Sequence, residues 1–157
     1  MKKGGWKVLI SSFVIVYAVA FLGSIFTSSS VKSAWYESIK PSLTPPNWVF
    51  PVVWNILFFL ISLALCFSWM NSDKKEKKRV STAFGMNLIA NFLWSVLYFG
   101  MHNPLVAFID IIVVWLSIAW MILVCWKIDR KSAYMLIPYL LWVSFASVLN
   151  FLSISKV

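Results

Sequence analysis

The side chains of this sequence that are best suited to chemistry are its tryptophans. The chain holds 10 tryptophans in 157 residues, and Trp35, Trp48 and Trp54 all lie in one polar, proline-rich stretch between two long apolar runs. An indole ring offers a flat apolar face and one N–H donor, which suits stacking on a flat, apolar, polycyclic ligand. We therefore interpret the stretch from Trp35 to Trp54 as the lid or rim of a ligand pocket.

Two further groups of residues could form the walls of such a pocket. Trp54 and Trp142 are expected about two helical turns inside two different helices, deeper than an interfacial aromatic belt normally lies. Asn87, Asn91 and Ser95 repeat every four residues, which places them on one helix face. That face either hydrogen-bonds neighbouring helices or forms the polar wall of a cavity, and the spacing leaves both alternatives open.

Conventional catalytic machinery is missing from the sequence. There is no Ser-His-Asp or Cys-His set, no glycine-rich phosphate loop and no pair of carboxylates, which disfavours hydrolysis, phosphoryl transfer and hydride transfer. His102 is the single histidine and cannot form a metal site alone, while Cys66 and Cys125 lie in apolar runs and are interpreted as packing residues. If the protein is an enzyme, the substrate or its photochemistry must supply the reactive group, with tryptophan as the protein partner.

The composition places these residues in a membrane. The chain is 61% hydrophobic and 12% charged, with a mean hydropathy of +0.84, against roughly 45–50% and about 25% in soluble domains. Its long apolar runs, each near the roughly 20 residues that cross a bilayer as helix, predict five transmembrane helices. Asp110 is the only ionisable side chain well inside a run. Because it has no basic partner there, we interpret it as a structural hydrogen-bonding group rather than a relay.

The predicted elements form one domain over residues 1–157. Helices are expected at about 6–27, 45–70, 80–101, 104–126 and 132–154, with a ligand-capping loop at about 28–44 that contains a short interfacial helix. Thr44-Pro45-Pro46 predicts the start of the second long helix, and Pro51 predicts a bend near its beginning. The apolar run after Lys7 is long for a cleaved secretory signal, so we expect the first helix to be retained.

The net charge of +9 is interpreted as a sign of topology rather than of nucleic-acid binding. The N-terminus, the loop at 71–79 and the loop at 127–131 hold 3, 5 and 3 basic residues, whereas the opposite side holds only Lys32, Lys40 and Lys156. Positive charge is concentrated on the cytoplasmic side of membrane proteins. We therefore expect a multi-pass protein of a bacterial cell membrane, with a cytoplasmic N-terminus and the 28–44 loop outside.

At this point the motifs become similar to those of a known family. In the first loop, the motif residues are Trp35-Tyr36, Lys40-Pro41, Thr44-Pro45-Pro46, Trp48 and Trp54. Further along the chain they are Asn87, Asn91, Trp94-Ser95, Phe99-Gly100, Ala107, Asp110, Pro138-Tyr139-Leu140, Trp142, Phe145-Ala146 and Leu149-Asn150. In this order they resemble the signature of the TspO/MBR family, the tryptophan-rich sensory and translocator proteins that include the peripheral-type benzodiazepine receptor of mammals.

This resemblance implies an all-α bundle of five transmembrane helices, homodimeric through the helix at about 80–101, with a pocket near the first loop. Members of the family bind porphyrins such as protoporphyrin IX and heme, sterols in animals, and synthetic benzodiazepine or isoquinoline carboxamide ligands. Some bacterial members degrade protoporphyrin IX in light. Carried over by motif, the pocket comprises Trp35, Tyr36, Pro45, Trp48, Trp54, Asn87, Asn91, Ser95, Trp142, Phe145, Ala146 and Leu149.

Trp54 and Trp142 are the residues that the resemblance implies for porphyrin photochemistry. The expected partners are a porphyrin or another flat apolar small molecule, membrane lipid and a second copy of the chain. No nucleic acid and no covalently bound cofactor are expected. The animal cholesterol motif has a tyrosine after Leu-Asn and an arginine beyond it, whereas this chain has Phe151 and Lys156, so cholesterol is not the expected natural ligand.

Three functions remain open at this stage. The chain could sense or handle a tetrapyrrole, with light-dependent degradation as an extension of that role. It could instead carry a porphyrin or another amphipathic solute across the membrane, or serve as a regulatory binding module without turnover. The absence of a polar path at the cytoplasmic ends and of an internal repeat disfavours transport.

Overall fold

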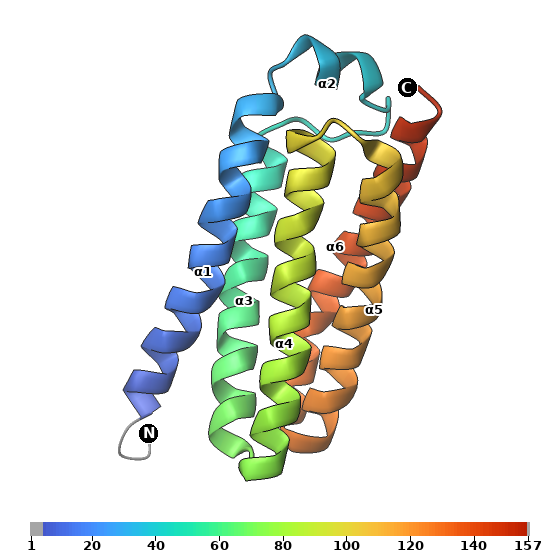
Figure 1. Ribbon diagram of the computed structural model, residues 1–157. Helices are drawn as coiled ribbons and strands as arrows, with labels where there is room; N and C mark the ends of the chain where they lie inside the picture. Colours follow the sequence, from blue (N-terminus) through green and yellow to red (C-terminus); the bar gives the residue numbers. More distant parts are fainter. Residues whose placement is uncertain (1–4, 157) are drawn as a thin grey trace.

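The computed structural model describes residues 5–156, and within them it contains helices and no strand (Figure 1). The long helices are α1 (Gly5–Ser30), α3 (Val49–Asn71), α4 (Lys74–Ser95), α5 (Pro104–Ile128) and α6 (Arg130–Ile154). A π-helical turn, η1 (Val96–Gly100), extends α4, and the short helix α2 (Ala34–Ile39) lies in the first loop. Between residues 5 and 156, five helices are long and apolar enough to cross a membrane, which confirms the predicted all-α, multi-pass membrane fold.

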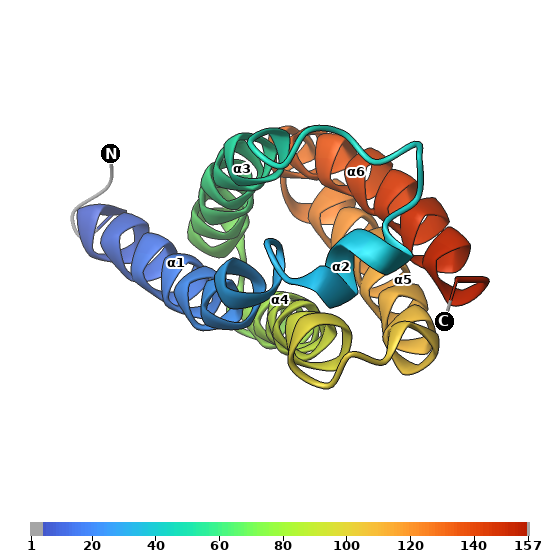
Figure 2. The same ribbon diagram turned by 90° about the horizontal axis from the view of Figure 1, so that it is seen from above.

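The five long helices form a ring that α2 covers at one end (Figures 1 and 2). Around the ring, α1 packs on α3 and α4, α6 packs on α3 and α5, and α5 packs on α4. Helix α1 leans away from the others toward its N-terminal end (Figure 1). The basic segments at 74–79 and 127–131 lie together at the end remote from α2, as the charge count requires, while Lys2 and Lys3 lie outside the described residues.

The second long helix begins later than predicted. It starts at Val49 rather than near residue 45, because Pro46 disfavours helical dihedral angles at Pro45 and the Thr44 hydroxyl caps no helix. The Thr44 N–H donates to the Pro41 carbonyl at 3.0 Å, so this stretch forms turns. Pro51 is thereby the third residue of α3, where an N–H would have no intrahelical partner, and the reason for the predicted bend is removed.

Two other helix ends also differ from the prediction, because side chains cap them. The charged segment at 71–79 is largely helical, since α4 begins at Lys74 rather than near residue 80. A capping box starts it: the Asp73 carboxylate accepts from the Glu76 N–H at 2.7 Å, and the Glu76 carboxylate accepts from the Asp73 N–H at 2.9 Å. Only Asp129 separates α5 from α6, and its carboxylate accepts from the Ser132 N–H at 3.1 Å.

The half of the bundle remote from α2 is closely packed with apolar side chains. Its fully or almost fully buried residues include Ile61, Ala64, Val80, Ala83, Phe84, Ile118, Met121, Cys125, Ala133 and Leu136. The apolar side chains that point outward, such as Ile10, Ile89 and Leu123, are exposed as befits contact with lipid. This half of the bundle is therefore closely packed, and the cavity described below lies in the half that α2 covers.

Candidate ligand cavity

A cavity of about 560 Å³ lies inside the helix ring, in the half beneath α2. All five long helices contribute to its wall, as do α2 and the loop that follows it. The volume falls within the roughly 300–1,000 Å³ of small-molecule sites. Among the described residues, none of the side chains that line it is charged. The cavity therefore offers an apolar and polar-uncharged surface to a small molecule.

The helix α2 is fixed over the cavity by a cap and by aromatic packing. The Ser33 hydroxyl accepts from the Tyr36 N–H at 3.2 Å, which starts the helix. Tyr36 is buried, lines the cavity and packs on Phe99 with ring centroids 5.7 Å apart. On the other side of α2, Trp35 stacks on His102 with centroids 4.2 Å apart. The two aromatic contacts attach the lid to the end of α4 and to the turn after it.

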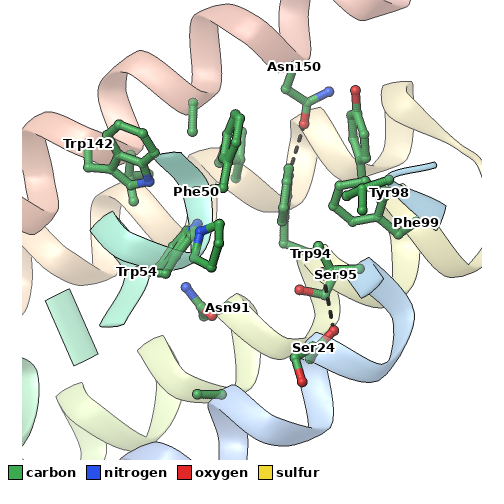
Figure 3. A pocket seen from close by; sticks show the side chains of 18 of the residues that line it. Ser24, Phe50, Trp54, Asn91, Trp94, Ser95, Tyr98, Phe99, Trp142 and Asn150 are labelled. Carbon is green, nitrogen blue, oxygen red and sulfur yellow. Dashed lines mark hydrogen bonds between the residues drawn. The ribbon is translucent and has the colours of Figure 1, made fainter. Parts of the chain in front are cut away.

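Aromatic side chains form two opposite parts of the wall (Figure 3). Trp54, Trp142 and Phe50 lie together, with Phe50 and Trp142 in an edge-to-face arrangement at 5.8 Å between centroids. Across the cavity, Trp94 stacks on Tyr98 at 5.1 Å and an interplanar angle of 22°. Flat faces of this kind suit a flat, apolar ligand through stacking.

A polar ladder along α4 and η1 joins the cavity wall to α5 and α6. Its members are Asn87, Asn91, Trp94 and Tyr98, which recur at three- and four-residue steps on one helix face. Asn87 donates to the Ser117 hydroxyl at 2.8 Å, and Asn91 donates to the Tyr139 hydroxyl at 2.9 Å. Trp94 donates to Asn150 at 3.0 Å, and the Tyr98 and Ser153 hydroxyls lie 2.8 Å apart.

The ladder answers the question that the Asn87, Asn91 and Ser95 spacing left open. Asn87 is fully buried, accepts from Tyr139 at 3.2 Å and does not line the cavity, so it joins helices. Asn91 both bonds to Tyr139 and lines the cavity, and Ser95 lines it as well. One helix face therefore serves both purposes, with the joining residue deepest in the bundle.

The residues predicted for the site fall into two groups. Those that line the cavity are Tyr36, Trp54, Asn91, Ser95, Trp142, Ala146 and Leu149. Those that do not are Trp35, Pro45, Trp48, Asn87 and Phe145. Trp48 is 68% exposed at the start of α3, and Phe145 lines a separate apolar groove of about 410 Å³ that Trp142 divides from the cavity.

Several lining residues were missing from the predicted set. Trp94 carries the clearest signal, because it lies three residues beyond Asn91 and so shares its helix face. Phe50 and Phe58 lie one turn before and after Trp54 and point the same way into the cavity. The Ser24 and Thr27 wall on α1 follows from the same helical spacing, but nothing in an apolar first helix distinguishes a cavity face from a lipid face.

Three buried polar atoms in the described part of the chain have no hydrogen-bond partner: the Thr44 hydroxyl, one Asp110 carboxylate oxygen and the Trp142 indole nitrogen. The hydrogen bond expected between Asp110 and a neighbouring helix is therefore not made by that oxygen, and Asp110 does not line the cavity. Thr44 and Trp142 do line it. Because no hydrogen bond holds the Trp142 indole, only packing fixes its ring between the cavity and the outer groove.

These features define the class of the protein. It is a multi-pass membrane protein whose helix ring encloses an uncharged cavity with aromatic walls beneath a short helical lid. The chain belongs to the TspO/MBR family, whose pattern matches residues 12–154.

Relatives agree over nearly the whole chain. It is 42% identical over 144 residues to the tryptophan-rich protein TspO of Archaeoglobus fulgidus, which covers 91% of this chain and 92% of that protein. It is 40% identical over 137 residues to the protein of the same name from Chlorobaculum tepidum, covering 85% of each. It is 33% identical over 141 residues to protein CrtK of Rhodobacter capsulatus, covering 88% of this chain and 86% of that protein.

The lid also has a predictable response to alkaline pH. Burial, with smaller contributions from Tyr98 and Glu37, raises the pKa of Tyr36 from 10.0 to about 12. The unfolded phenol therefore loses its proton at lower pH than the folded one, so the stabilisation by Tyr36 is complete below pH 10 and is lost as the pH rises toward 12. We expect the unfolding temperature of wild type to fall more steeply across this interval than that of Tyr36→Phe.

The comparison is made on the two proteins in the same detergent, so that their pH curves differ only through the residue at position 36 and its interaction with Tyr98. The unfolding temperature can be followed through the exposure of Cys66 and Cys125 to a thiol-reactive fluorophore, because both thiols are buried in the fold. Parallel pH curves for the two proteins would contradict the assignment of the raised pKa to Tyr36.

Proposed function

We propose that this protein binds a porphyrin in the cavity and acts as a membrane sensor or handler of tetrapyrroles. The observation that carries the proposal is the uncharged cavity with aromatic faces on two sides, Trp54 and Trp142 on one and Trp94 on the other. A flat macrocycle would stack on these faces and bury its apolar surface. The same surface would accept benzodiazepine-type and isoquinoline carboxamide ligands, which are also aromatic and uncharged over most of their area.

The lining favours a metal-free porphyrin such as protoporphyrin IX over heme. Among the described residues, the cavity wall contains no histidine, cysteine or methionine, which are common axial ligands of heme iron. It does contain Tyr17, Tyr36 and Tyr98, and a tyrosine ligates iron as its phenolate. Burial raises the pKa of Tyr36 and so disfavours that form at the lid. His102 lies outside the cavity against Trp35. A porphyrin would thus be held by stacking and by contacts with its substituents rather than by iron ligation.

Binding is favoured over transport by the position of the cavity. A carrier needs a path from its site to each side of the membrane. Below the cavity, the bundle is filled by side chains such as Ile61, Ile118 and Met121, all fully buried. These side chains leave no path from the cavity to the end remote from α2 within the described residues.

The predicted homodimer would use an exposed apolar face of α4. Met86, Ile89 and Leu93 are exposed on that helix and are available for contact with a second copy of the chain. The homodimer stays a prediction.

The experiment that tests the proposal is a dark titration of the purified protein with protoporphyrin IX, followed through the porphyrin absorption band. We expect saturable binding by wild type. Ala146→Phe should weaken it by about tenfold or more, because a phenyl ring in place of the methyl group occupies the cavity. The matched control is Val148→Phe, at an exposed position on the same helix that should face lipid and leave binding unchanged. Binding that does not saturate would remove the tetrapyrrole proposal.

A light-dependent degrading activity is a second candidate, supported by the two tryptophans on the cavity wall. If Trp54 and Trp142 take part in porphyrin photochemistry, Trp54→Phe and Trp142→Phe should keep dark binding within about threefold, because phenyl rings still stack. Both variants should lose most of the light-driven decay of the porphyrin band. Trp126→Phe, outside the cavity on α5, serves as the control. Wild-type decay in both cavity variants would exclude this role for them.

We further propose that the lid faces the outside of a bacterial cell membrane. The charged ends at 74–79 and 127–131 lie opposite the lid, which under the positive-inside rule makes them cytoplasmic. A cysteine at Ser33 should therefore react with a membrane-impermeant thiol reagent in intact cells, while a cysteine at the exposed Asn71 should react only after lysis. Protection of the Ser33 cysteine in intact cells would reverse the proposed orientation.

A further inference from the structure

Two lysines lie at the loop end of the otherwise uncharged cavity. Lys40 directly follows α2, and its Nζ lies 3.4 Å from Asn47 Oδ1 and 5.8 Å from the centroid of the Tyr36 ring. Asn47 and Tyr36 both line the cavity, so Lys40 stands at its rim. Lys156, just beyond α6, donates from Nζ to the Lys40 carbonyl at 2.8 Å. The segment that carries Lys40 is thus fastened to the end of the last helix.

We call the loop end of the cavity, formed by Lys40, Thr44, Asn47 and Lys156, the rim. It carries an excess of positive charge. Among the described residues, the acidic side chain at this rim is that of Glu37, which lies 3.5 Å from Lys40 Nζ and is 55% exposed against 24% for Lys40. An exposed ion pair of this kind is weak. The contact of Lys40 with Asn47 is also long for a hydrogen bond. The Lys40 ammonium group has three donors, and within the described part of the chain its side-chain oxygen partners are those of Asn47 and Glu37, so it has capacity for a further acceptor.

Uncharged donors lie between the lysines and the apolar interior. The Thr44 hydroxyl lines the cavity, is buried, and has no partner among the described residues. Tyr36 keeps its phenolic proton at physiological pH, as its raised pKa requires, and also lines the cavity. A buried hydroxyl without a partner is costly, and a ligand oxygen would satisfy it. Charged side chains and a free hydroxyl thus lie at the loop end of the cavity, whereas the polar groups on the other walls are uncharged.

We propose that this rim recognises an anionic group, such as a carboxylate, on a ligand whose apolar body lies in the cavity, and that Lys40 is the residue that determines this specificity. The inference rests on the proposed porphyrin binding and adds to it the class and orientation of the ligand. The apolar ring points into the bundle, and the acidic substituents point to the lid. Lys156 acts as a positioning residue, because it holds the backbone of Lys40 rather than the ligand.

A purely structural role for Lys40 makes a different prediction. If Lys40 only braced the lid through Glu37 and Asn47, its loss would weaken the binding of every cavity ligand to a similar degree. If Lys40 interacts with the charge of the ligand, its loss would weaken the binding of anionic ligands only. Protoporphyrin IX and its dimethyl ester separate the two cases, since they share one ring system and differ in the charge of two side chains.

The experiment measures the dark affinities of both porphyrins for wild type and three variants in uncharged detergent. Lys40→Gln should lower the affinity for protoporphyrin IX about tenfold, the loss expected for one charge-assisted hydrogen bond, and leave that for the ester unchanged. Glu37→Gln should raise the affinity for protoporphyrin IX alone by about threefold, since it removes a repulsive charge. Lys32→Gln, at an exposed lysine of the same end that does not line the cavity, is the control and should change neither affinity.

Salt provides a second readout of the same charge. The preference of wild type for protoporphyrin IX over its ester should shrink at high ionic strength, because the rim is partly exposed. This dependence should be much smaller in Lys40→Gln. Equal losses for both porphyrins in Lys40→Gln, or no loss for either, would overturn the inference while leaving porphyrin binding intact. Failure of wild type to bind either porphyrin would instead overturn the proposed function, and this inference with it.

Discussion

The hydrogen bonds that run from α4 and η1 to α5 and α6 are the interaction on which the cavity depends. A polar side chain in hydrocarbon must find a partner inside the protein, and helices in a membrane gain no hydrophobic attraction for one another. The ladder of Asn87, Asn91, Trp94 and Tyr98 supplies such partners at four levels. These bonds fix α4, α5 and α6 relative to one another. The cavity can therefore stay open between them and the helices α1 and α3.

The π-helical turn at Val96–Gly100 extends this ladder to the lid. A π turn is wider than an α turn, and such turns frequently occur at functional sites. Here Tyr98 and Phe99 are both buried although they are adjacent in sequence, one facing Ser153 and the other Tyr36. Gly100 completes the turn where α1 comes close, since a Cβ at this position would lie 2.9 Å from the Phe26 ring. The same few residues thus attach α1, α2 and α6 to the end of α4.

The number and type of the membrane helices follow from apolar content alone, but their ends do not. Asp73 and Asp129 lengthen helices through side-chain caps, and Pro45-Pro46 delays one, because these effects depend on local hydrogen bonds and dihedral angles rather than on hydropathy. The candidate site shows the same division. Tyr36, Trp54, Asn91 and Trp142 lie on the cavity wall as motif and depth suggested, whereas Trp35 and Trp48 share their motif and lie elsewhere. A sequence motif identifies residues that belong to one region of the fold. Whether such a residue faces the cavity or packs against the lid depends on the packing of the helices, which the motif does not contain.

The polar and apolar parts of the cavity lie at different depths, and this arrangement would orient a bound ligand. The deep walls are aromatic, and their polar groups apart from the Trp142 indole nitrogen are largely hydrogen-bonded within the bundle, so these walls would favour a ligand for its shape and apolar area rather than its charge. The unpartnered hydroxyl of Thr44 and the ammonium groups of Lys40 and Lys156 are all near the lid. A ligand with an apolar ring and acidic substituents would match both regions in one orientation. Because Lys156 donates to the Lys40 carbonyl, contact between Lys40 and an acidic group would act on a segment that joins α2 to the end of α6.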